Sequence, residues 1–182
     1  MIFEKEIEFK TLITKEQYES LIKEFDLKDN VFCQINHYFD TSESKLHDEK
    51  IVLRIRQKGD NYKLTKKVKG TIGNDESHIF LTETKAQEYI ANGFDADIMN
   101  LPYQVKKVAE LTTYRSSTFY KHGKLFFDRS EYYGHVDYEI EYEAEHDEEG
   151  KNDFIKFMED HEIEYKESPK KSVRAYNALN NK

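Results

Sequence analysis

The sequence contains little cysteine, proline or glycine, with one cysteine, two prolines and seven glycines among 182 residues. Disulfide bridges and thiolate metal sites both need several cysteines, so a lone Cys33 excludes a disulfide framework and a thiolate-bound metal. Cys33 lies in the apolar segment 31–33, where we expect it to be buried as a small hydrophobic side chain. This cysteine usage is typical of the reducing cytoplasm.

Long apolar runs and linker-like stretches are also missing. No run approaches the roughly 20 apolar residues that a membrane-spanning helix needs, and the first residues show no signal-peptide pattern. No internal repeat or low-complexity linker divides the chain. We therefore expect a single domain over residues 1–182 that works in the cytoplasm, away from membranes.

Basic residues do not dominate the composition. Lysine and arginine total 28 against 36 aspartates and glutamates, which gives a net charge of −8 at pH 7. Non-specific binding of nucleic acid needs a basic surface, so we expect no nucleic-acid partner. Acidic and basic residues are, however, segregated along the chain, and this segregation is the main functional signal.

Eight segments alternate apolar with polar residues and are rich in Ile, Val, Thr, Tyr and Phe, as β-strands are. They cover residues 2–12, 31–40, 51–58, 61–69, 78–84, 111–120, 124–130 and 135–145. Helices are predicted over residues 14–26, 85–93, 103–110, 152–161 and 169–180. Because closing a sheet removes its edges, we expect an α+β fold, an eight-stranded closed antiparallel β-barrel with packing helices. The acidic run 145–149 is expected to be a solvated loop.

Several predicted strands carry charges of one sign on one face, since side chains two residues apart share a face. The acidic faces hold Glu4, Glu6 and Glu8, followed by Lys10, in the first strand, and Glu139, Glu141 and Glu143 in the last. The basic faces hold Arg54 and Arg56 in the third strand and Lys63 and Lys67 in the fourth. Any one of these faces could simply be the solvated side of a sheet.

As a set, the charged faces favour a different explanation. Solvated faces usually mix signs, because like charges side by side destabilise a sheet. Clustered carboxylates suit a hard divalent cation such as Mg²⁺ or Mn²⁺, and clustered Arg and Lys suit phosphate oxygens. If the barrel closes with these faces inward, its interior is a charged tunnel that fits a metal-bound polyphosphate.

These residues resemble the CYTH superfamily, also called the triphosphate tunnel metalloenzymes. The family's E-x-E-x-K signature stands here as Glu6-Ile7-Glu8-Phe9-Lys10. Further similar segments are QINHYFDT (34–41), LRIR (53–56), YKLTKKVKG (62–70), LFFDRSEYYG (125–134), DYEIEYE (137–143) and KKSVRA (170–175). Together they span residues 4–175. The resemblance implies an eight-stranded tunnel and metal-dependent chemistry on triphosphates.

Carried over residue by residue, the resemblance implies a set of roles. The expected metal ligands, for Mg²⁺ or Mn²⁺, are Glu6, Glu8, Glu139 and Glu141. The expected phosphate-binding residues are Lys10, Arg54, Arg56, Lys63, Lys67, Arg115 and Lys171. The catalytic candidates are Lys10, Arg115, Asp128 and Lys171. Glu4 and Glu143 extend the acidic faces, so the metal ligands could shift by one strand step. Lys170 could take the place of Lys171. Glu83 is a further candidate site residue, and only strand alternation supports it.

The leading prediction is metal-dependent hydrolysis of inorganic tripolyphosphate or of a small organic or nucleoside triphosphate. The runner-up is a class IV adenylyl cyclase, which would expel pyrophosphate from ATP and would need a nucleoside pocket. A third possibility is a non-catalytic module that binds polyphosphate or nucleotides, although pure anion binding would not need so many glutamates. We expect a small-molecule triphosphate as the partner, and a monomer or homodimer.

Overall fold

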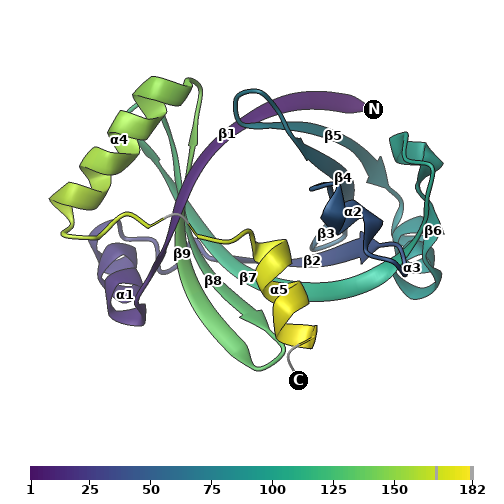
Figure 1. The fold of residues 1–182 in the computed structure, drawn as a ribbon. Coiled ribbons are helices and arrows are strands. Elements are labelled where there is room, and N and C mark those ends of the chain that lie inside the picture. Colours follow the sequence, from purple (N-terminus) through teal and green to yellow (C-terminus); the bar gives the residue numbers. More distant parts are fainter. Residues whose placement is uncertain (167, 181–182) are drawn as a thin grey trace.

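The computed structural model describes residues 1–166 and 168–180. Within them, eight long antiparallel strands form a closed barrel (Figure 1). They are β1 (Ile2–Ile13), β2 (Phe32–Asp40), β3 (Val52–Lys58), β4 (Asn61–Lys69), β5 (Asn74–Leu81), β7 (Gln104–Tyr120), β8 (Gly123–Tyr132) and β9 (His135–Ala144). Their order around the barrel is β2-β3-β4-β5-β1-β9-β8-β7, and pairing of β7 with β2 closes it. The predicted eight-stranded antiparallel barrel is therefore confirmed.

Strand β1 joins the two halves of the barrel. Residues 2–6 pair with β5, and residues 7–13 pair with β9. The turn between β4 and β5 sits tightly against the point where β1 changes partners. There Gly73 has a φ of 68°, and a Cβ atom on it would lie 2.2 Å from the carbonyl oxygen of Glu6. Only glycine fits this position, so the turn fixes the backbone of Glu6.

The helices lie outside the barrel wall. In the described residues they are α1 (Lys15–Glu24), α2 (Lys45–Asp48), α3 (Glu83–Asn92), α4 (Asp147–Asp160) and α5 (Lys171–Asn180). A 3₁₀ turn (Ala96–Met99) follows the short strand β6 (Phe94–Asp95), which pairs with the start of β7. α1 begins at a capping box, where the Thr14 side chain accepts from the Gln17 backbone N–H and the Gln17 side chain accepts from that of Thr14. None of these helices is long and apolar enough to cross a bilayer.

The apolar core lies between the helices and the outer face of the barrel. α1 and α4 cover one side, where Leu21, Phe127 and Phe157 are buried together, and α3 covers the opposite side (Figure 1). Along β3, Leu53 and Ile55 point outward into the second core. The residues between them must then point inward. The charged faces therefore line the inside of the barrel.

Several local predictions are wrong. The helix predicted over residues 103–110 does not form, and residues 104–110 are the start of β7, because Lys106 and Ala109 pair with β2 and this pairing outweighs local helix propensity. The fifth strand covers residues 74–81 instead of 78–84. Glu83 consequently lies in the first turn of α3, after Thr82 caps the helix. Cys33 is exposed, not buried.

The acidic run 145–149 also differs from the expected loop. Residues 147–149 form the first turn of α4. Carboxylates are favourable there because the N-terminal end of a helix carries partial positive charge.

Candidate functional site

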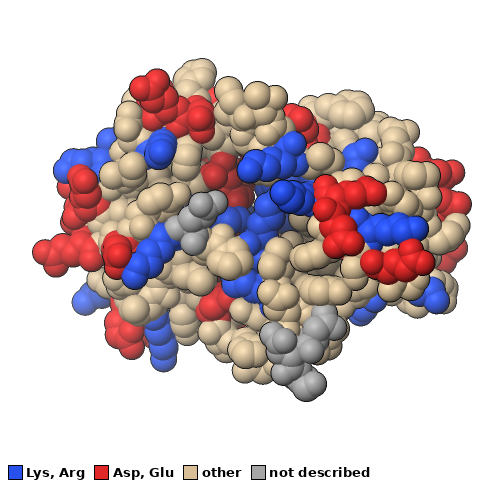
Figure 2. Space-filling model, viewed as in Figure 1, with Lys and Arg blue, Asp and Glu red and all other residues tan. Residues whose placement is uncertain are grey.

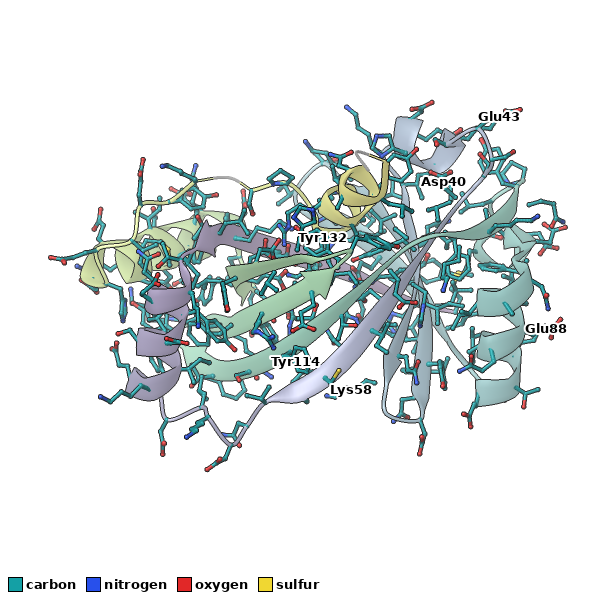
Figure 3. The ribbon with its side chains drawn as sticks, turned by 90° about the horizontal axis from the view of Figure 1, so that it is seen from below. Asp40, Glu43, Lys58, Glu88, Tyr114 and Tyr132 are labelled. Atoms are coloured by element: carbon teal, nitrogen blue, oxygen red, sulfur yellow. The ribbon has the colours of Figure 1, made fainter. Side chains whose placement is uncertain are left out.

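The barrel encloses a cavity of about 1070 Å³ that is lined mostly by charged side chains. Looking down the barrel, Figure 2 shows Lys and Arg side chains gathered in a central hollow, with acidic side chains beside them. α5 lies across this end of the barrel (Figure 1). Lys58 and Asp40 lie at opposite ends of the strands (Figure 3), and Lys58 marks the end away from α5.

The structure brings the predicted site residues together. Those that line the cavity are Glu6, Glu8, Lys10, Arg54, Arg56, Lys63, Lys67, Arg115, Glu141 and Lys171. Asp128 and Glu139 are fully buried in the wall and contact cavity-lining cations. Glu83 is the exception, because it lies in α3 outside the wall.

One acidic cluster consists of Asp128, Glu139 and Glu141, and we call it the paired cluster. One carboxylate oxygen from each lies within 4.8 Å of the others. Arg115 donates to Asp128 through Nε at 2.7 Å and through Nη2 at 2.6 Å, and it also contacts Glu141. Lys171 lies 2.8 Å from Asp128 and contacts the other two carboxylates. Every carboxylate of this cluster therefore contacts at least one cation.

The pKa values of the two cations reflect this pairing. Burial alone would lower the pKa of Arg115, but Asp128 and Glu141 outweigh it and raise that pKa. The same balance of burial against three carboxylates raises the pKa of Lys171. Both side chains are therefore held charged and in fixed positions.

The first turn of α5 contains a second cation, Arg174, that contacts β9 as Lys171 does. Arg174 follows Lys171 by three residues, a spacing that places both on one face of the helix. It donates to Glu139 at 2.7 Å and lies 3.0 Å from Asp137. Sequence reasoning gave Arg174 no role, although this spacing was visible. Lys171 and Arg174 therefore hold α5 against β9 through these ion pairs.

The second acidic cluster consists of Glu6, Glu8 and Glu143, and we call it the open cluster. Oxygens from the three side chains lie within 4.8 Å of one another. Lys67 contacts Glu6, and Lys10 donates to Glu8 at 2.8 Å. Glu143 makes no ion pair with any residue that the structure describes. Burial raises the pKa of Glu143 to about 7, and the neighbouring Glu6 adds to the effect. This cluster therefore holds more negative charge than its own cations neutralise.

Several cavity-lining cations lack any carboxylate within 4 Å in the described part of the chain, and Arg56, Lys63 and Lys170 are among them. Burial lowers the pKa of Arg56 to about 10, and the neighbouring cations Arg54 and Arg115 add to the effect. Burial and neighbouring cations also lower the pKa values of Lys63 and Lys170. Like charges collected in this way, without counter-charges, form a site for an anion.

Glu76 and Asn36 are site residues that sequence reasoning missed. Glu76 faces the cavity from β5, 3.4 Å from Lys67 and 3.9 Å from Arg54. The alternation of β5 would have identified it had that strand been placed at residues 74–81. Asn36 accepts a 3.3 Å hydrogen bond from Nε of Arg56 and orients that guanidinium.

Comparison with known proteins agrees with this geometry. A model of the CYTH domain matches residues 4–176. The chain belongs to the CYTH family. It is 32% identical over 184 residues to a protein of Bacillus subtilis (strain 168) named "Putative triphosphatase YjbK", and the match covers 95% of each chain. The family resemblance seen in the sequence is thereby confirmed.

Solved structures extend the CYTH comparison. A crystal structure from Bacillus halodurans, described as "a putative adenylate cyclase", has a TM-score of 0.89 and 30% identity, and the match covers 96% of this chain and 98% of that one. The Hippeastrum protein HpAC1 is described as a "putative adenylyl cyclase" with a dominant triphosphatase activity. It has a TM-score of 0.76 and 22% identity, with 96% of each chain covered, and shows the shared fold.

Proposed function

We propose that this CYTH protein is a divalent-metal-dependent triphosphatase that hydrolyses a phosphoanhydride bond of tripolyphosphate or of a small organic triphosphate. The observation that carries the proposal is the excess charge of both signs inside one cavity. Among the described residues, Arg56, Lys63 and Lys170 have no carboxylate within 4 Å, and the open cluster has three carboxylates but only two cations, Lys10 and Lys67, in contact with it. A polyphosphate with a bound cation would satisfy both needs. The Bacillus subtilis relative's name supports the same activity.

The residues of the open cluster fit the implied metal. Glu6 and Glu8 on β1 and Glu143 on β9 offer three carboxylates to one point, and Mg²⁺ and Mn²⁺ both prefer oxygen ligands. When bound, such an ion neutralises charge on phosphate oxygens and lowers the pKa of a bound water. Glu139 and Glu141 remain predicted ligands, but they belong to the paired cluster, where Lys171 contacts both.

Phosphoryl transfer depends mainly on positioning and on stabilising charge. We assign Arg54, Arg56, Lys63 and Lys67, on the adjacent strands β3 and β4, to binding the phosphate chain. Arg115, Lys171 and Lys10 supply further positive charge from β7, α5 and β1. Asp128 is fully buried and contacts Arg115 and Lys171, so its role is to hold these two cations in position.

A phosphate-release assay tests the proposal. Purified protein is given tripolyphosphate, ATP or thiamine triphosphate with Mg²⁺, with Mn²⁺ or with a chelator. We expect release only when metal is present, and loss of release in Glu6→Ala and Glu8→Ala. Glu83→Ala is the matched control, since this glutamate lies in α3, and it should keep full activity. Full activity in both Glu6→Ala and Glu8→Ala would refute the metal assignment.

The second candidate is an adenylyl cyclase, which the Bacillus halodurans relative's description favours. It would bind the triphosphate on the same walls, but the attacking group would be the 3′-hydroxyl of the substrate instead of water. The products separate the two activities, because a cyclase forms cyclic AMP and pyrophosphate from ATP. Metal-dependent binding without any turnover would instead indicate a triphosphate sensor. In each case the proposed partner is a small molecule bound by a monomer or homodimer.

A further inference from the structure

The end of the tunnel away from α5 carries phenylalanines on its inner surface. We call this end the far mouth. The residues that line it are Phe32, Lys58, Lys63, Phe80, Phe119 and Lys124. Phe80 is 67% exposed and Phe119 is 82% exposed. Ligand pockets are lined by aromatic side chains together with a few polar groups, so exposed rings on a cavity wall are candidates for contact with a ligand.

The two exposed rings lie on opposite sides of the far mouth. Phe80 is on β5 and Phe119 is on β7, and three strands separate β5 from β7 in either direction around the barrel. Both residues lie near the ends of their strands, and both line the cavity. A flat ligand that enters or leaves this end of the tunnel must pass between them.

Two cations that have no carboxylate within 4 Å among the described residues, Arg56 and Lys63, lie on the wall beside this mouth. Arg56 pairs in register with Lys63 across β3 and β4, and Lys63 pairs with Phe80 across β4 and β5. Neighbouring strands lie about 4.8 Å apart, so Phe80 is about 10 Å from Arg56 along the wall. Two cations that can bind phosphate, Arg56 and Lys63, are therefore followed along the wall by the exposed ring of Phe80. This spacing matches that of a phosphate chain joined to an organic group.

Lysines already lie close to the rings of the far mouth. Nζ of Lys58 is 3.7 Å from the centroid of Phe32, and Nζ of Lys124 is 5.5 Å from that of Phe119. These ammonium groups can bind phosphate or ring substituents of a ligand while the phenyl rings stack on its flat face. Inorganic polyphosphate would use the lysines but would gain nothing from the rings.

We propose that the far mouth binds a planar heteroaromatic group, and that the tunnel therefore favours nucleoside-type triphosphates over inorganic tripolyphosphate. The inference rests on the proposed function and deepens it by naming the substrate class. Phe80 and Phe119 stack on the ring, and Lys63 binds the nearest phosphate.

The test compares the ratio of kcat/KM for ATP to kcat/KM for tripolyphosphate among variants. Phe80→Ala and Phe119→Ala should each lower this ratio by about tenfold, within the range of measured losses when a stacking ring is removed. Phe80→Trp should keep it at or above the wild-type value. Phe3→Ala is the matched control, because Phe3 is 73% exposed at the same end of β1 but does not line the cavity. This control should leave the ratio unchanged.

Several outcomes would overturn the inference. An unchanged ratio in both alanine variants would show that the rings do not contact the substrate. A change in molar mass by light scattering in Phe119→Ala would show that this ring serves self-association. If the wild-type protein hydrolyses neither substrate, the proposed function fails, and calorimetric titration with ATP and tripolyphosphate then tests the far mouth separately. Equal weakening of both ligands by Phe80→Ala would refute the aromatic subsite.

Discussion

Replacing Arg56 by methionine should stabilise the protein in the absence of ligand while removing its affinity for triphosphate. The guanidinium has no carboxylate within 4 Å among the described residues, and burial beside other cations lowers its pKa to about 10. In the unfolded chain its pKa is higher, so folding disfavours the charged form. At pH 7 Arg56 is charged in both the folded and the unfolded protein, so the full free-energy penalty of burying this charge is present. The penalty decreases only as the pH rises through 10.

The magnitude follows from this fall in pKa. At about 1.4 kcal/mol per pKa unit, a fall of more than two units corresponds to about 3 kcal/mol. Solvent inside the tunnel screens the charge and reduces this to about half. Loss of the hydrogen bond from Arg56 to Asn36 offsets about 1 kcal/mol. The net expectation for Arg56→Met is a stabilisation of about 0.5 kcal/mol.

Arg115 provides the matched comparison, because it is equally cationic but is paired with Asp128 and Glu141. Arg115→Met leaves these carboxylates buried without their partner and should destabilise the fold by about 3–5 kcal/mol. Urea unfolding followed by circular dichroism at pH 7, with a chelator and no phosphate, measures both variants. Tripolyphosphate at about 100 times its Kd should then stabilise the wild type by about 2.7 kcal/mol but have little effect on Arg56→Met. Equal destabilisation by the two variants would refute the reasoning.

Two further predictions concern the open cluster and the first helix. Burial and Glu6 raise the pKa of Glu143 to about 7, so the charged form opposes folding more strongly as the pH rises from about 5 towards 8. Glu143→Gln should therefore raise the Tm of the metal-free protein at pH 8 more than at pH 5. It should also abolish the rise in Tm that Mn²⁺ causes. A Tm of the variant below that of the wild type at pH 8 would contradict this. Thr14→Ala removes the cap of α1 and should cost about 1 kcal/mol in urea unfolding, with phosphate release unchanged. A loss of activity would show that α1 does more than pack against the barrel.

Strand alternation explains why the sequence predicted most of the site. Arg54 and Arg56 are inward-facing because Leu53 and Ile55 must be buried outside the barrel, and a period of two residues makes this visible in the sequence. The same pattern marks Glu6 and Glu8. Residue types and spacing alone therefore located the charged wall that we propose to bind phosphate.

The remaining features depend on contacts between distant segments. The start of β7 contains Lys, Ala and Glu residues that favour a helix locally, and only pairing with β2 makes it a strand. Glu76 was missed because the glycine-containing turn before β5 ends four residues earlier than expected. Whether a given cation is paired also depends on such contacts. Lys171 meets Glu139 across 32 residues of sequence, whereas Arg56 meets no carboxylate in the described structure.

A crystal structure with Mn²⁺ and a non-hydrolysable imidotriphosphate tests the central claim most directly, since anomalous scattering locates the metal independently of the phosphates. We predict a manganese peak among Glu6, Glu8 and Glu143, with the phosphate chain against Arg56 and Lys63. A metal and phosphate chain bound together outside the tunnel, or no binding of either at saturating concentrations, would contradict the account.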